Sequence, residues 1–65
     1  MDPDATFRAM TTLIRNNPGR FNRKLRAELR ELHGAYVAWR NMGGFPAERA
    51  TRDEFFAVYR RELHG

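Results

Sequence analysis

The sequence predicts an all-α fold, a compact three-helix bundle that forms one small domain over residues 1–65. Apolar residues recur at helical spacing in three segments, and no stretch of useful length alternates apolar and polar residues as a β-strand does. Two clusters of turn-forming residues, at 16–19 and 43–46, separate these segments. The chain is 42% hydrophobic, with one Trp, two Tyr and five Phe, and can therefore fill a core, unlike a disordered segment.

The first helix is expected over residues 3–15. Asp2 is a good N-cap, Pro3 suits the first helical position, and Asp4 complements the positive end of the helix dipole. The sequence Asn-Asn-Pro-Gly at 16–19 then ends the helix, because proline cannot continue it and Pro-Gly favours a turn. The apolar face consists of Phe7, Met10 and Ile14.

The second helix is expected over residues 22–42, with Asn22 as its cap. Its apolar seam repeats at intervals of four and three residues and consists of Leu25, Leu29, Leu32, Tyr36 and Trp39. Gly34 lies inside this segment, and a glycine in a helix interior costs about 1 kcal/mol relative to alanine. The seam continues in phase on both sides of Gly34, which favours one long helix with a possible kink there.

The third helix is expected over residues 51–63. Thr51 and Glu54 have the spacing of a capping box, in which the Thr side chain accepts the backbone N–H of the Glu and the Glu side chain accepts the backbone N–H of the Thr. The apolar stripe that follows consists of Phe55, Phe56, Tyr59 and Leu63, flanked by Val58.

Metal and cofactor sites are not expected. There is no Cys, which excludes disulfides, and His33 and His64 cannot complete a four-ligand zinc site without thiolates. No apolar run approaches the length of a membrane span, and the N-terminus is acidic where a signal peptide would be basic. We therefore expect a cytoplasmic protein without cofactor or membrane partner.

Catalysis is not expected either, because the chain offers few reactive groups. It has neither Cys nor Ser, and Lys24 has little interior in which it could be desolvated. His33 lies two residues from Glu31, a spacing at which helical side chains point apart rather than meet. The same spacing separates His64 from Glu62.

Nucleic-acid binding is the first functional hypothesis. The net charge of +4 is concentrated in residues 15–30, where Glu28 is the single acid, and helical spacing places Arg23, Arg26 and Arg30 on one flank of the second helix. Arginines pair well with phosphates, and the turns are too long for a helix-turn-helix, so a regulatory accessory protein that contacts the phosphate backbone is expected. The candidate residues are Arg15, Arg20, Arg23, Lys24, Arg26 and Arg30. The alternative is that an Arg-rich composition places arginine on any solvated helix face.

Protein binding is the second functional hypothesis. Phe55 and Phe56 are adjacent and point about 100° apart, so one helix cannot easily bury both together with Val58. A homodimer seam, or docking onto a larger protein as an inhibitor or adaptor, would cover the remaining ring. The candidate interface residues are Trp39, Phe45, Phe55, Phe56, Tyr59 and Arg60, although most of these aromatic residues could equally belong to the core.

Overall fold

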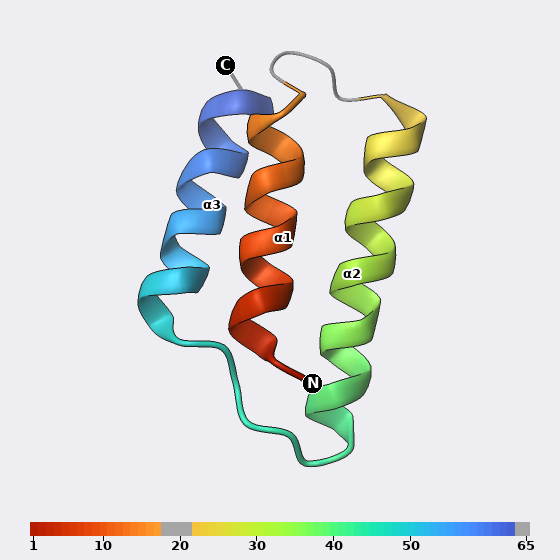
Figure 1. Ribbon diagram of the computed structural model, residues 1–65, viewed down its shortest axis with the longest axis vertical. Helices are drawn as coiled ribbons and strands as arrows, with labels where there is room; N and C mark the ends of the chain where they lie inside the picture. The colour runs from red at the N-terminus through yellow and green to blue at the C-terminus, as the bar shows by residue number, and fades with distance from the viewer. Residues whose placement is uncertain (18–21, 64–65) are drawn as a thin grey trace.

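The computed structural model describes residues 1–17 and 22–63, and of Leu63 it describes the backbone. It contains three helices, α1 (Pro3–Arg15), α2 (Arg23–Asn41) and α3 (Arg49–Leu63), which run up, down and up (Figure 1). No strand occurs in the described ranges. The predicted all-α, three-helix fold is confirmed.

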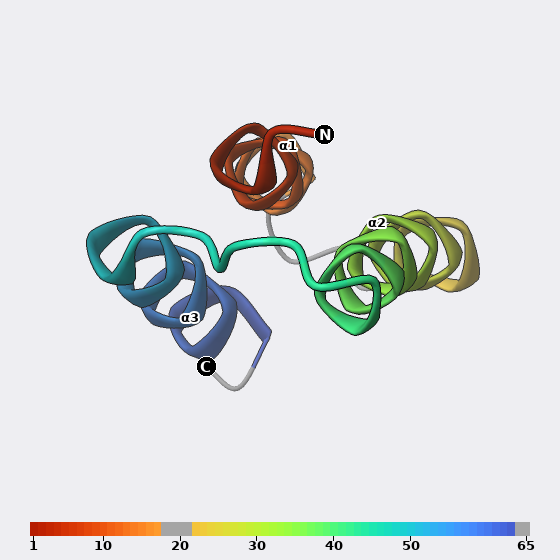
Figure 2. The same cartoon turned by 90° about the horizontal axis from the view of Figure 1, so that it is seen from below.

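The helix α1 occupies the centre of the arrangement. Its backbone lies close to both α2 and α3, whereas the backbones of α2 and α3 do not approach each other closely within the described residues. Side chains of all three helices share one hydrophobic core. Figure 2 shows the same arrangement from below, with α1 on one side and α2 and α3 set apart from each other beneath it. The helix α1 is thus the one that approaches both of the others.

The helix α1 begins as its sequence predicts. The carboxylate of Asp2 accepts the N–H groups of Asp4 and Ala5 at 3.0 and 3.1 Å, and Pro3 occupies the first turn. Thr11 is buried, but its hydroxyl donates to the carbonyl of Phe7 at 3.0 Å, so its polar group is satisfied. The hydrophobic core consists of Phe7, Met10, Ile14, Leu25, Leu29, Ala47, Phe55 and Val58.

Phe7 joins the three helices through its ring. It makes edge-to-face contacts with Tyr36 of α2, at a centroid distance of 4.9 Å, and with Phe55 of α3, at 5.6 Å. Such contacts stabilise beyond the apolar area that they bury, by about 0.5–1.5 kcal/mol each. The core is therefore centred on α1.

The helix α2 is continuous through Gly34, where the sequence allows a kink, and it does not break there. The side chain of Asn22 caps it by accepting the N–H of Leu25 at 2.9 Å. It ends where Gly43 adopts a φ of +92°, a left-handed conformation that favours glycine. The predicted cap and bounds agree with the structure to within one residue.

The start of α3 corrects the predicted capping box. The helix begins at Arg49, two residues before the expected start, so Thr51 is a helical residue and not the cap. The reason is a tertiary contact: the carboxylate of Asp4 accepts the N–H of Glu48 at 2.7 Å. The hydroxyl of Tyr36 also accepts the N–H of Ala47, at 3.3 Å. Side chains from α1 and α2 thus satisfy the backbone that enters α3.

Candidate functional site

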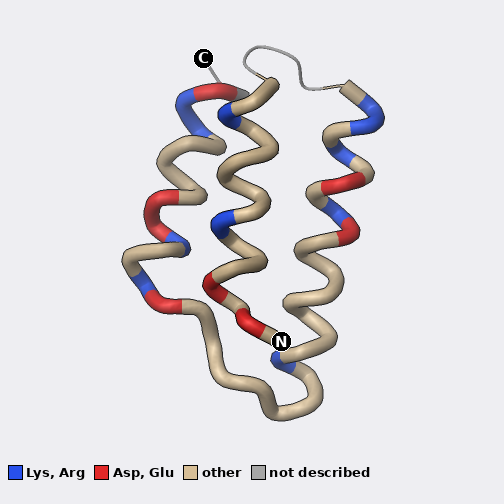
Figure 3. The backbone as a smooth tube through the Cα atoms, viewed as in Figure 1, with Lys and Arg blue, Asp and Glu red and all other residues tan. Residues whose placement is uncertain are grey.

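Three arginines of α2 form a row that we call the basic row, Arg23, Arg26 and Arg30. They are spaced three and four residues apart, so they share one flank of the helix, and together with Ala27 they line a shallow hollow. Figure 3 shows Lys and Arg gathered in the first half of α2, near the end of the molecule where α3 finishes. The predicted stripe is therefore a real surface feature.

Two of the three arginines of the basic row have no acidic partner among the described residues. Arg23 and Arg30 have no ion-pair partner in the described part of the chain. The two glutamates of this region, Glu28 and Glu31, lie on the other flank of α2, where they line a hollow with Leu13 of α1. The row thus presents positive charge without an acid between its members.

The remaining candidates for nucleic-acid contact do not join this row. Lys24 lines a different hollow, together with Asn17, Asn22 and Glu28. Arg15 belongs to α1, and its Nη2 donates to Oε1 of Glu54 on α3 at 3.0 Å. Its guanidinium therefore serves the contact between α1 and α3.

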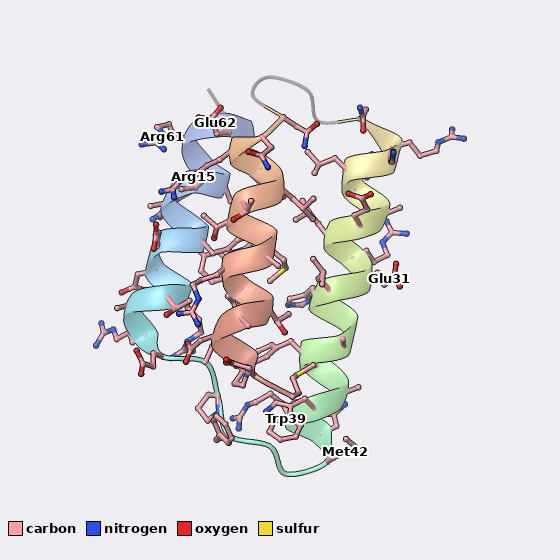
Figure 4. The ribbon with its side chains drawn as sticks, in the orientation of Figure 1. Arg15, Glu31, Trp39, Met42, Arg61 and Glu62 are labelled. Atoms are coloured by element: carbon pink, nitrogen blue, oxygen red, sulfur yellow. The ribbon has the colours of Figure 1, made fainter. Side chains whose placement is uncertain are left out.

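The last candidate of this set, Arg20, lies outside the described residues, as does His64. Figure 4 places Arg15 at the end of the molecule where Arg61 and Glu62 of α3 also lie. Positive charge at this end therefore comes from all three helices, but the arginines that share one flank of one helix are those of the basic row.

The adjacent phenylalanines separate as the helical geometry requires. Phe55 is 7% exposed and belongs to the core, whereas Phe56 is 49% exposed. Their rings still touch, with centroids 5.2 Å apart. Phe55 is thus unavailable to a partner, and Phe56 is the ring that the bundle leaves uncovered.

Trp39 and Phe45 hold the connection between α2 and α3. The indole N–H of Trp39 donates to the carbonyl of Phe45 at 2.9 Å, and the two rings meet edge to face at 5.5 Å. Arg40 adds a hydrogen bond to the carbonyl of Gly44 at 2.7 Å. Trp39 is half-buried and Phe45 stays exposed, at the end of the molecule opposite Arg61, as Figure 4 shows for Trp39 and Met42.

The structure shows surface features that the sequence analysis missed. Val37 and Met42 are exposed apolar residues of α2 and its end, and the Nε of Arg52 is buried without a hydrogen-bond partner in the described ranges. Arg52 precedes Phe56 by four residues, and this spacing in the sequence already indicates that the two share one face of the helix. The two remaining interface candidates, Tyr59 and Arg60, are half-buried and exposed respectively.

Neither a metal-binding cluster nor a membrane-spanning helix is found among the described residues. Within residues 1–17 and 22–63, no cluster of three or more His, Asp or Glu could hold a metal ion. In the same ranges, no helix combines the length and apolarity needed to cross a bilayer. Comparison of the chain with protein-family models, curated proteins and solved structures finds no significant match. The function is therefore inferred from the surface of this chain alone.

Proposed function

We propose that this protein is a non-catalytic, cytoplasmic accessory protein that binds the phosphate backbone of nucleic acids through the basic row of α2. The observation that carries the proposal is the row itself, three arginines on one helix flank with no acid among them. Each guanidinium can donate two parallel hydrogen bonds to a phosphate. A rigid helix fixes the spacing of these three groups.

The mode of contact follows from the shape of this surface. The row begins at Arg23, the first residue of α2, and runs along one side of the helix, and the hollow that it lines is shallow. Arginines arranged in this way reach phosphates but place no side-chain cluster deep in a groove, where bases are read. We therefore propose backbone contact that does not depend on base sequence.

The number of contacts sets the expected salt dependence. Three neutralised phosphates on duplex DNA give a slope of about −2.7 in log affinity against log salt. Between about 50 mM and about 200 mM salt, that slope weakens binding by about 40-fold. The measurement is fluorescence anisotropy of a labelled duplex of about 20 base pairs and of an oligo-dT strand of about the same length.

A triple variant tests the location. Replacing Arg23, Arg26 and Arg30 by alanine should remove most of the affinity and bring the salt slope close to zero. The matched control, Arg8→Ala with Arg49→Ala and Arg61→Ala, has the same net charge but alters exposed residues of α1 and α3. Equal losses in the two triple variants would show that only net charge matters, and a lack of binding by the unmodified chain to either nucleic acid would refute the proposal.

A further inference from the structure

No helix of the described residues stands at the corner of the bundle opposite α1. The backbones of α2 and α3 each approach α1 closely but do not approach each other within the described residues, and the two helices run in opposite directions on either side of that corner (Figure 2). In a four-helix bundle a fourth helix stands in this position, contacting both of its neighbours. We call this position the open corner.

Contacts with α1 show which flank of α2 borders the open corner. Arg15 of α1 points to α3, where it meets Glu54, and Leu13 lies two residues earlier, about 200° around the helix. Leu13 therefore points away from α3. Because Leu13 shares a hollow with Glu28 and Glu31, the glutamate flank of α2 is also turned away from α3. The opposite flank of α2 borders the open corner.

That opposite flank carries positive and apolar residues. Arg26, Arg30, His33 and Val37 follow one another at helical spacing and form the corner row of α2. Val37 is 42% exposed although it is apolar. The row contains no acidic residue.

The same reasoning identifies the flank of α3. Glu54 points to Arg15 on the outer side of α1, so Phe56, two residues later, points to the opposite side and towards the open corner. Arg52, Phe56, Tyr59 and Arg60 lie at helical spacing and form the corner row of α3. Phe56 is half exposed there, and the Nε of Arg52 is a buried donor with no hydrogen-bond partner in the described residues. This row also lacks an acidic residue.

The charge and shape of the two corner rows indicate which kind of ligand would bind at the open corner. Apolar and aromatic side chains lie between arginines on both sides, and Arg30 and Arg60 have no ion-pair partner in the described ranges. Two copies of this chain that met through this face would bring arginines against arginines, which disfavours a homodimer there. The complementary ligand has an apolar stripe flanked by carboxylates.

We propose that the open corner binds an acidic amphipathic helix of a partner protein. Its apolar stripe would pack on Phe56 and Val37, completing a four-helix arrangement, while its Glu or Asp residues pair with Arg30 and Arg60. Arg26 and Arg30 belong both to the basic row and to the corner row of α2, so the two proposed interactions share these arginines. They differ in α3, because the partner helix needs Phe56 and Arg60 whereas the phosphate backbone does not.

The test uses a synthetic helical peptide as the probe. It carries Leu at positions i, i+3, i+4 and i+7 in repeated turns and Glu on both flanks, and a matched peptide carries Lys in place of every Glu. Titration into the full chain is followed by calorimetry and by backbone amide NMR shifts. We expect binding of the Glu peptide, with shifts centred on Phe56, Tyr59 and Val37, and affinity at least about tenfold weaker for the Lys peptide.

Variants locate the site separately from the basic row. Phe56→Ala and Arg60→Glu should each weaken the Glu peptide by about tenfold or more. Met42→Ala removes another exposed apolar side chain, and Arg61→Glu makes the same charge change at the neighbouring residue about 100° away, so both should leave binding unchanged. The triple variant of the basic row is used for the nucleic-acid test and not for the peptide titration.

Four results would overturn this proposal. The Glu and Lys peptides could bind equally, or Phe56→Ala and Arg60→Glu could have no effect. A dimer in light scattering that Phe56→Ala converts to a monomer would assign the open corner to a second copy. Shifts caused by oligo-dT that centre on Phe56 and disappear in Phe56→Ala would assign it to nucleic acid.

Discussion

Gly34 provides a quantitative test of the continuity of α2. It lies in the middle of the helix, and no atom lies within 4 Å of the place where a Cβ would be added. Alanine is favoured over glycine in a helix interior by about 1 kcal/mol, because it has less backbone freedom to lose on folding. The unfolding entropy of a 65-residue chain is about 0.14 kcal/mol per degree. Gly34→Ala should therefore raise the free energy of unfolding by about 1 kcal/mol and Tm by about 7 °C.

Gly44 is the matched comparison, because the same chemical change there has the opposite effect. A Cβ at Gly44 would collide with the indole ring of Trp39. That ring cannot easily move, since its N–H donates to the carbonyl of Phe45 at 2.9 Å. Gly44→Ala should lower the free energy of unfolding by about 1–3 kcal/mol, the usual cost of overpacking.

The assay is thermal and urea unfolding of the two variants and the unmodified chain, followed by far-UV circular dichroism. The effects of alanine on the unfolded chain are similar at both positions, so the difference between the variants reports the folded structure. A Gly34→Ala variant that is less stable than the unmodified chain would refute the continuous helix, because alanine is penalised where a glycine ends a helix in the left-handed conformation. Equal effects of the two substitutions would refute the contact between Gly44 and Trp39.

Three further predictions concern single contacts. Asp4→Ala should lower the free energy of unfolding by about 1–2 kcal/mol, because Asp4 caps the backbone that enters α3, whereas Thr51→Ala should change it by less than about 0.5 kcal/mol. Urea unfolding compares the two variants, and a larger loss for Thr51→Ala would support the local capping box instead. A double-mutant cycle on Arg15 and Glu54, both half exposed, should give a coupling of about 0.2–1 kcal/mol that falls at high salt, and a coupling insensitive to salt would contradict a solvent-screened pair. Phe7→Ala should destabilise by about 3–5 kcal/mol in the same assay, and a loss below about 1 kcal/mol would contradict its central position.

The elements that the sequence predicts well are those whose signals are local. Asp2 and Asn22 cap α1 and α2 through N–H groups two or three residues away, so the pattern and the structure coincide. The start of α3 could not be predicted in this way. Its preceding N–H groups are accepted by Asp4 and Tyr36, which are 44 and 11 residues distant in the chain. A capping pattern in sequence competes with such tertiary acceptors and here does not form.

The surface follows the same division. The spacing of Arg23, Arg26 and Arg30 suffices to place them on one flank, because all three belong to one helix. Among the described residues of the charge run from 15 to 30, Arg15 does not join the basic row, because it belongs to α1. Arg15 is instead paired with Glu54, 39 residues away. Charge proximity in sequence thus predicts proximity in space only within an element.

The open corner follows from how burial is divided among the three helices. Five residues of α1 are buried, and they include Phe7, which contacts aromatic rings of both neighbours. The helices α2 and α3 each bury two residues and keep exposed apolar side chains such as Val37 and Phe56. Both helices therefore satisfy their apolar faces mainly against α1 and gain little from each other. A ligand that contacts α2 and α3 together adds apolar burial that the chain alone lacks, whereas a phosphate backbone on the basic row contacts α2 alone. Binding at the corner thus couples two helices that the fold leaves uncoupled, and by mass action a ligand at 100 times its Kd would stabilise the chain by about 2.7 kcal/mol.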